Sequence, residues 1–564
     1  MKNLSSRTIL WLVFTASIVM LWQQWNMAHA PLPVAATSTS TATNAGTGNT
    51  AAATATAPTA TASAAVPVNL SVKPAGQSIV LKNDKISLKV NTEGGVIEYA
   101  ELLDYRDSKD KSKNEVLFTT DNNRIYVSRS GVVVDGNVTN NIDHKAAFTA
   151  SATEAVLQEG ANDVSLVLTA ANNGVKLTKT YTLHRGSYVL DVNHDVENTS
   201  AAAISPKVYL DLTRDSVDLD KSFFYSTYNG PVIYNSEDKF KKVAFSKIQD
   251  GDAAFTAKSD NGWIGMLQHY FVSAWVLPNN EVRPREFSTV KPEAGDKEQV
   301  YSVREIIPMG SVAPAATAQL ATQLYVGPQN QEVLGAVATG LERSVDYGWA
   351  TLIATPIHWV MTFIHKFIPN WGWTIVALTI LMKLALFPLT AASYKSMAKM
   401  KLLAPRLKAL QETHKDDRMK MNQATMELYK SEKVNPAGGC LPMIIQMPVF
   451  LALYYVLQSA VEMRGAPWLG WVQDLSLPDH FYILPALMVI TMLIQTRLNP
   501  KPADPMQAKM MTWMPLIFGV TFFWFPAGLV LYWVVSNIFS IFQQHFMNKK
   551  FGIKDSIIPL KEES

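Results

Sequence analysis

The stretch WTIVALTILMKLALFPLTAASY, from Trp373 to Tyr394, decides the fold class of this 564-residue chain. It is apolar except for Lys383 and a few hydroxyl-bearing side chains. About 20 residues of this kind cross the hydrocarbon core of a bilayer as a helix. Further apolar runs follow it at residues 441–461, 481–496, 510–525 and 529–546. These runs predict an all-α membrane bundle in the last third of the chain.

Another apolar run lies near the N-terminus, at Thr8–Trp22, and the Ala28-His29-Ala30 sequence after it is similar to a signal-peptidase site. A cleaved signal peptide is one interpretation. We favour an uncleaved anchor over residues 1–30, because Pro31 is a poor residue after a cleavage site and Trp25 fits an interfacial aromatic belt. The chain is therefore expected to have six membrane spans, of which five form the core of the bundle.

The polar first half of the chain changes composition at about residue 76. Residues 31–75 are mostly Ala, Thr, Ser, Gly, Asn and Pro, which cannot bury enough apolar surface to fold, so we expect a flexible linker. Residues 76–330 alternate apolar and polar side chains, as in VKLTKTY at Val175–Tyr181, and this period is typical of half-buried strands. One large all-β sandwich of roughly 250 residues is within the range of single domains.

The β domain shows no catalytic constellation in its sequence. Its acidic residues lack the paired spacing of a glycosidase, and its histidines are scattered. The one cysteine of the chain, Cys440, lies in an apolar run, so no intrachain disulfide is possible. No Gly-Lys-Ser/Thr phosphate loop occurs in the sequence. We therefore expect no enzymatic activity, no cofactor and no metal.

The charge distribution predicts the orientation in the membrane. Residues 395–433 carry ten Lys or Arg residues, and the positive-inside rule places such a segment in the cytoplasm. Residues 331–370 are largely apolar but contain Pro356 and His365, and if they crossed the membrane the basic segment would lie outside. We therefore predict a helix along the outer interface for residues 331–370. The β domain is then outside, whereas both termini, including the basic tail at 548–564, are inside.

The basic cytoplasmic segment, residues 395–435, has apolar residues at helical spacing in two places. Met400, Leu403, Leu407 and Leu410 form the first set, so two short antiparallel helices are expected. Pro405 should bend or interrupt the first of them. The basic outer face suits anionic lipid or ribosomal RNA, although a solvated positive-inside loop is the more common interpretation.

Lys383 lies about midway along its predicted span, where a charge costs about 3 kcal/mol. The other apolar runs contain no Asp or Glu to pair with it. Neutral polar residues occur instead, namely Thr379 and Thr390 on its own face, Gln446 in the next span, and Tyr532, Ser536, Asn537, Ser540 and Gln543 in the last. We infer a wet, cationic groove. The alternative is a snorkelling lysine, with hydroxyl groups that only bridge helices.

Several motifs in the apolar half resemble the YidC family of membrane protein insertases. They are KVNPAGGCLP at Lys433–Pro442, QMPVFLALYY at Gln446–Tyr455, Asn370-Trp371-Gly372, Pro388-Leu389-Thr390, DPMQ at Asp504–Gln507 and FPAGLVLY at Phe525–Tyr532. The resemblance extends from about Asp346 to Phe546. In the β domain, GWIGMLQHYF at Gly262–Phe271 resembles the exported domain of Gram-negative members, which is a β-supersandwich.

This resemblance implies a protein that places newly made proteins into the bacterial inner membrane, alone or beside the Sec translocon and its accessory subunits. It also implies a periplasmic β domain and a hydrophilic groove that is open to lipid and cytoplasm. The groove residues of the family correspond to Thr379, Lys383, Gln446, Tyr532, Trp533, Ser536 and Asn537. Lys383 replaces the usual arginine and lacks its planar fork, and Trp533 stands where relatives often have a second tyrosine.

Two other classes of protein are possible from the sequence. A secondary transporter usually has repeated halves and intramembrane carboxylates, and this chain shows neither. A membrane-tethered carbohydrate-binding protein would carry its site in the β domain, and deletion of that domain would then abolish function. The insertase interpretation predicts instead that much function survives such a deletion.

Overall fold

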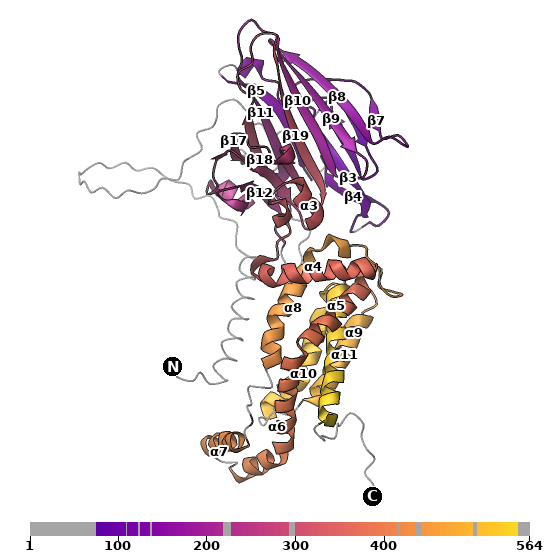
Figure 1. Cartoon of the computed structure of the whole chain (residues 1–564), viewed down its shortest axis with the longest axis vertical. Helices are drawn as coiled ribbons and strands as arrows, with labels where there is room; N and C mark the ends of the chain where they lie inside the picture. Colours follow the sequence, from indigo (N-terminus) through magenta and orange to yellow (C-terminus); the bar gives the residue numbers. More distant parts are fainter. Residues whose placement is uncertain are drawn as a thin grey trace, which may run out of the picture. The chain divides into compact units, whose positions relative to one another are not determined.

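The computed structural model describes residues 75–550 except 109, 122–123, 136–137, 218–226, 293–298, 415–416, 433, 435–440 and 500–504. The expected N-terminal anchor, nearly all of the expected linker, the motif residues 435–440 and most of the expected tail lie outside the described residues. The described chain forms a two-sheet β domain, and a helical region follows it in sequence (Figure 1).

The first sheet of the β domain has ten strands in the order β14-β17-β18-β11-β5-β3-β2-β1-β7, with β4 paired to β3. Their bounds are β14 (Lys258–Ser259), β17 (Arg285–Val290), β18 (Val300–Pro308), β11 (Pro206–Asp215), β5 (Tyr126–Val134), β3 (Ile97–Arg106), β2 (Ile86–Asn91), β1 (Ser78–Lys82), β7 (Glu154–Val156) and β4 (Asn114–Phe118). The described pairs are antiparallel except β1 with β7.

The second sheet has nine strands in the order β13-β12-β15-β16-β19-β10-β9-β8-β6. Their bounds are β13 (Lys239–Lys242), β12 (Gly230–Asn235), β15 (Trp263–Leu267), β16 (Phe271–Val276), β19 (Thr317–Pro328), β10 (Val189–Asn198), β9 (Val175–His184), β8 (Asp163–Asn172) and β6 (Thr149–Ala150). One short helix, α2 (Phe245–Asp250), lies between β13 and β14 in the chain.

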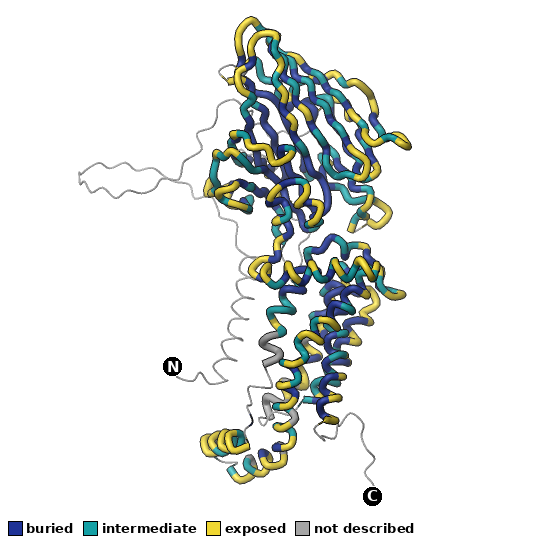
Figure 2. The backbone as a smooth tube through the Cα atoms, in the orientation of Figure 1, coloured by how far each residue is buried: buried dark blue, intermediate teal, exposed yellow. Residues whose placement is uncertain are grey.

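Alternating residues of the two sheets form one shared hydrophobic core, visible as the dark blue stretches of the strands in Figure 2. On β9, Val175, Leu177, Lys179 and Tyr181 are buried, whereas the three residues between them are partly exposed. Leu88 and Leu210 of the first sheet belong to the same core. The predicted β-sandwich is therefore confirmed, and the period-two pattern identified its buried face.

The helical region contains nine described α-helices. They are α3 (Gln331–Val337), α4 (Thr351–Phe367), α5 (Trp371–Ala385), α6 (Phe387–Thr413), α7 (Arg418–Ser431), α8 (Leu441–Ser459), α9 (Ile483–Leu498), α10 (Pro505–Thr521) and α11 (Ala527–Lys550). Helix α11 packs against α5 and α9, and α4 packs against α8 and α5. Leu403, Leu407 and Val434 form a small separate core where α6 meets α7.

Residues 331–370 form several short elements, so the single interfacial helix predicted there is wrong in its length. Gly340 and Gly348 adopt left-handed φ angles of 84° and 56° at the starts of two short 3-10 helices, Leu341–Ser344 and Gly348–Ala350, and so divide the chain between α3 and α4. Only α4 is long. One of its faces packs inside the region, whereas Trp359 and Phe363 stack on the exposed face at 5.9 Å between ring centroids.

The span predicted as continuous to Tyr394 is bent by 65° between α5 and α6. Pro388 explains the break, because proline lacks the N–H that would bond to residue 384 and its ring clashes with that turn. Beyond this bend, α6 runs without interruption through Pro405 to Thr413, so of the two effects expected of Pro405, a bend or an interruption, the interruption does not occur. Lys383 consequently lies in the last turn of α5 rather than in the middle of one straight helix.

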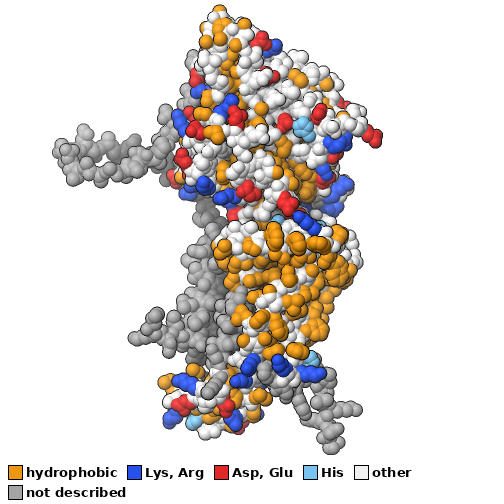
Figure 3. Space-filling view, in the orientation of Figure 1, with side chains coloured by type: hydrophobic (Ala, Val, Ile, Leu, Met, Phe, Trp, Pro, Cys, Tyr) orange, Lys and Arg blue, Asp and Glu red, His pale blue; other side chains and the backbone are white. Residues whose placement is uncertain are grey.

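Among the described helices, α11 alone is long and apolar enough to cross a membrane by itself. The bent pair of α5 with residues 387–403 adds a second such element if it is counted as one span, while α9 and residues 512–524 are apolar but shorter. The outer surface of the region is rich in hydrophobic side chains (Figure 3). Leu381, Trp513, Ile517 and Phe542 are each at least half exposed, and a contiguous surface of this kind is typical of contact with a membrane or a partner.

Candidate functional site

Lys383 is enclosed by α5, α8 and α11, with 6% of the residue exposed. Its Nζ atom donates a hydrogen bond to the Ser540 Oγ atom on α11 at 2.9 Å and to the Gln446 Oε1 atom on α8 at 3.3 Å. No ion pair of Lys383 occurs within the described residues. Neutral oxygen atoms therefore solvate this cation, and they do so without cancelling its charge.

The polar contacts continue from Lys383 toward the start of α11. The Gln446 Nε2 atom donates to the Ser536 Oγ atom at 3.1 Å, so both ends of the Gln446 amide are used. The Tyr394 hydroxyl of α6 donates to the Ser540 carbonyl at 3.4 Å. We call Lys383, Gln446, Ser536 and Ser540 the Lys383 cluster. It joins three helices through side chains that carry a single formal charge.

Aromatic rings lie about one helical turn before Ser536 on α11. Tyr532 is buried and stacks on Phe450 of α8, with 6.3 Å between the ring centroids. Trp533 packs edge-on against the same Phe450 ring at 4.5 Å and against Phe522 at 5.0 Å. The two aromatic site residues predicted from the sequence thus form one apolar wall with α8, next to the Lys383 cluster.

Two other predicted site residues use their polar groups elsewhere. The Thr379 hydroxyl donates to the Ile375 carbonyl of its own helix at 2.6 Å. The Asn537 Nδ2 atom donates to the Thr491 Oγ1 atom on α9 at 3.2 Å. Ser540, which belongs to the polar stripe predicted on the last span but not to the predicted groove residues, is a direct partner of Lys383. Its spacing of four residues from Ser536 repeats one face of a helix.

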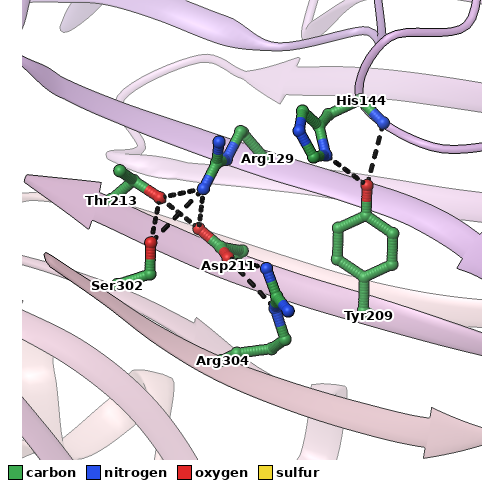
Figure 4. Close-up of polar contacts among 7 residues, drawn as sticks. All are labelled: Arg129, His144, Tyr209, Asp211, Thr213, Ser302 and Arg304. Carbon is green, nitrogen blue, oxygen red and sulfur yellow. Dashed lines mark hydrogen bonds and ion pairs between the residues drawn. The ribbon is translucent and has the colours of Figure 1, made fainter. Parts of the chain in front are cut away.

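The β domain contains a buried polar cluster of a different kind (Figure 4). Asp211 on β11 lies between Arg129 of β5, at 3.1 Å, and Arg304 of β18, at 2.9 Å. Burial alone would raise the pKa of Asp211, but attraction to the two guanidinium groups outweighs it and lowers the pKa to about 2. The three side chains are at most 5% exposed, so this network is closed to a ligand.

The described residues contain no group of three or more His, Cys, Asp or Glu side chains placed to hold a metal ion. The polar groups that converge in the helical region are a lysine, a glutamine and hydroxyl groups. Such groups can hydrogen-bond to a polypeptide or solvate charge, and neither task requires bond cleavage.

The described chain combines a β-sandwich domain with helices that are apolar on their outer surface and enclose Lys383. This combination defines a class of membrane-associated protein. The chain belongs to the YidC family of membrane protein insertases. The family model described as 60Kd inner membrane protein matches residues 363–554, and the model of the YidC periplasmic domain matches residues 78–360. The resemblance seen in the sequence motifs is therefore confirmed. The family is one of non-enzymatic insertases of the inner membrane.

Known relatives match nearly the whole chain. The membrane protein insertase YidC of Cupriavidus metallidurans is 47% identical over 553 residues, which cover 97% of this chain and 98% of that protein. The YidC of Janthinobacterium sp. (strain Marseille) is 48% identical over 570 residues, with coverage of 97% and 99%. A crystal structure of an active YidC insertase with its first transmembrane domain resolved matches with 19% identity and a TM-score of 0.39, over 84% of this chain and 95% of that one.

Proposed function

We propose that this protein inserts newly made proteins into the inner membrane and assists their folding, either alone or beside the Sec translocon and its accessory subunits. The observation that carries the proposal is the enclosed Lys383 cation, which has only Ser540 and Gln446 as described partners. Placing a charged side chain inside a membrane-spanning bundle costs free energy, and such residues are usually functional.

The proposed mechanism lowers the free-energy barrier to crossing the membrane and makes no covalent bonds. A substrate helix of about 20 apolar residues is stable in lipid, but its polar flank must first cross about 30 Å of hydrocarbon. Lysine has three donors, and the described contacts of Lys383 use two. The third donor is free to solvate a carbonyl or carboxylate group of the substrate's polar flank. The flank therefore meets a polar environment part of the way across the membrane. The apolar segment then leaves sideways into lipid.

The substrate groove is proposed to be lined by Lys383, Gln446, Tyr532, Trp533 and Ser536, with Thr379 and Asn537 behind them. Two arrangements support this assignment. The Lys383 cluster supplies hydrogen-bonding groups, and the Tyr532 and Trp533 rings beside it supply an apolar wall. A substrate at this boundary would place its polar flank on the cluster and its apolar segment on the rings.

We propose a six-span topology with both termini in the cytoplasm. The division is an anchor at 1–30, a linker at 31–75, a periplasmic β-supersandwich at 76–330, an interfacial segment at 331–370, a membrane core at 371–547 and a basic tail at 548–564. The hairpin at 395–435 lies in the cytoplasm. The exposed aromatic face of α4 supports its place at the outer interface, because Trp359 suits the headgroup region.

The hairpin formed by α6 and α7 is the proposed cytoplasmic contact site. Its basic residues, together with the basic tail, suit anionic lipid headgroups and ribosomal RNA, both of which are polyanions. Leu402 and Met419 are more than half exposed there and could contact a nascent apolar segment. The hairpin would then receive the substrate before it reaches Lys383.

The test is insertion of a small single-span substrate into proteoliposomes that contain only this protein. Wild type should give protease-protected substrate above the level of empty liposomes. A hydrogen bond to a charged group contributes about 1.5–3 kcal/mol, so Lys383→Ala should lower the insertion rate roughly ten- to a hundredfold. Lys383→Glu should lower it further, and Lys383→Arg should restore most of it.

Lys408→Glu is the matched control, because Lys408 is an exposed residue of α6 outside the Lys383 cluster. It makes the same charge reversal and should leave insertion unchanged. Wild type no better than empty liposomes would remove the proposed activity. Equal insertion by wild type and Lys383→Glu would keep the activity but remove the role of Lys383.

A further inference from the structure

Gln543 on α11 is a buried glutamine whose side chain has no partner. Only 6% of the residue is exposed, and neither its Nε2 nor its Oε1 atom forms a hydrogen bond in the structure. It follows Tyr532, Ser536 and Ser540 at intervals of four, four and three residues, so it lies on the same face of α11 as the Lys383 cluster. This face therefore ends in an amide whose hydrogen-bonding capacity is unused.

Two other glutamines of the helical region use their side-chain amides in hydrogen bonds. The Gln446 amide uses both of its ends, with Lys383 and Ser536. The Gln544 Nε2 atom donates to the Leu498 carbonyl and to the Asn499 Oδ1 atom, both at 3.1 Å, and so ties α11 to the end of α9. The Gln544 Oε1 atom has no partner among the described residues, so Gln543 differs from Gln544 in leaving both ends of the amide unpaired. An unpaired buried amide lowers stability relative to an apolar side chain of similar size. Folding alone therefore gives no reason for glutamine at position 543.

We propose that Gln543 is a substrate-binding residue, whose amide pairs with the peptide backbone of the inserting polypeptide. This proposal rests on the proposed function and adds a contact to it. A primary amide offers two donors and one acceptor, which complement the C=O and N–H groups of an extended peptide. Backbone groups are common to all substrates, so this contact would not depend on the substrate sequence.

The position of Gln543 fits such a contact geometrically. Three residues along α11 correspond to about 4.5 Å from Ser540, in the direction of the helix end that carries Lys549 and Lys550. An extended chain advances roughly 3.3 Å per residue, so two successive substrate residues could reach Lys383 and Gln543 together. The polar flank would then meet Gln543 first and Lys383 second as it moves away from the basic end.

The first test compares Gln543→Leu with Gln544→Leu in the full-length protein, for both stability and insertion in proteoliposomes. Gln543→Leu should leave the thermal midpoint of the helical region unchanged or raise it, yet lower the insertion rate about tenfold, the effect of one net hydrogen bond. Gln543→Asn should recover part of the rate. Gln544→Leu should lower the thermal midpoint, because it breaks the tie to α9.

A photo-crosslinking residue at position 543 or 544 provides a second measurement that does not depend on the leucine variant. During insertion of a stalled substrate, position 543 should crosslink to the polypeptide and position 544 should not. Normal insertion by Gln543→Leu, or equal crosslinking at both positions, would overturn the role of Gln543 while the insertase activity stands. Absence of insertion by wild type would overturn the proposed function and this role with it.

Discussion

The β domain and the helical region each bury charged side chains, but they satisfy them in opposite ways. In the β domain, Asp211 lies between Arg129 and Arg304, so opposite charges are in direct contact. In the helical region, Lys383 contacts a hydroxyl and an amide and has no described carboxylate partner. The exposed fractions are similar, at 0% for Asp211 and 6% for Lys383. Burial alone therefore does not determine how a charge is compensated.

The difference indicates what each charge is for. The ion pairs around Asp211 are complete and closed, so removing one member leaves uncompensated charge and the network serves the fold. The partners of Lys383 are neutral dipoles, which stabilise the cation without cancelling its charge. Its electrostatic attraction therefore remains available to a substrate. Lys179 provides an intermediate case, because it is a fully buried lysine of the β domain whose Nζ atom donates to the carbonyls of Gly94, at 2.8 Å, and Ser130, at 2.7 Å.

The largest expected effect comes from breaking the Asp211 network. Asp211→Asn leaves Arg129 and Arg304 buried without a counter-charge, and loss of one partner of a buried pair costs about 3–5 kcal/mol. The free energy of unfolding of the β domain should fall by that amount. Pulse proteolysis of the full-length protein across a urea series measures it.

Glu197→Gln is the control for the Asp211 prediction. Glu197 pairs with Lys176 at 3.0 Å, but both side chains are about half exposed, and exposed pairs contribute about 0–1 kcal/mol. Its effect should therefore be small. If Asp211→Asn lowered the free energy of unfolding no more than Glu197→Gln, the Asp211 network would not stabilise the β domain.

The second expected effect concerns the pH dependence of the β domain. Burial lowers the pKa of Lys179 from 10.5 to about 7, so the unfolded chain binds one more proton than the folded chain between these values. Stability should therefore rise with pH from about 7 to 10.5, with a slope of up to about 1.4 kcal/mol per pH unit. This pH-dependent gain in stability should be absent below about pH 7, where Lys179 is protonated in both the folded and the unfolded chain.

The matched variant for this measurement is Lys179→Met, which removes the titrating group and keeps a long side chain. Urea unfolding of the full-length protein at pH 7 and pH 9 should show a gain of about 2 kcal/mol in wild type beyond the gain in the variant. Other titrating groups cancel in that difference. The same pH dependence in both proteins would mean that Lys179 stays charged among its carbonyl partners.

Strands such as β9 were predictable because only one of their faces is buried. Val175 and Leu177 alternate with polar residues, and a shift of one residue would place them in solvent. The order of strands in the sheets was not predictable, since the contacts that set it join distant residues. Arg129 and Arg304 reach Asp211 across 82 and 93 residues, and neither strand carries a repeated charge pattern that points to β11. No local pattern connects such residues.

For the candidate site, the sequence predicted which helix faces are polar but not which residues contact Lys383. Polar spacing indicated α8 and α11 as the partners of Lys383, and Gln446 and Ser540 confirm both helices. Which residue faces the cation depends on side-chain reach, which spacing does not encode. A threonine hydroxyl is short enough to bond the carbonyl four residues earlier, as Thr379 does. The bend before Pro388 was missed because membrane helices often tolerate proline.

The smallest expected effect separates Ser540, a direct partner of Lys383, from Thr379, which the family pattern places in the groove. Ser540→Ala removes a direct partner of Lys383 and should lower insertion in proteoliposomes about two- to tenfold, since Gln446 and water replace part of the lost hydrogen bond. Thr379→Val removes a hydroxyl that already bonds to Ile375 and keeps its shape, so insertion should change less than about twofold. Initial rates of protease-protected insertion measure both. An equal loss in the two variants would mean that the Thr379 hydroxyl leaves its own helix to meet the substrate, and that the polar surface around Lys383 is wider than the Lys383 cluster.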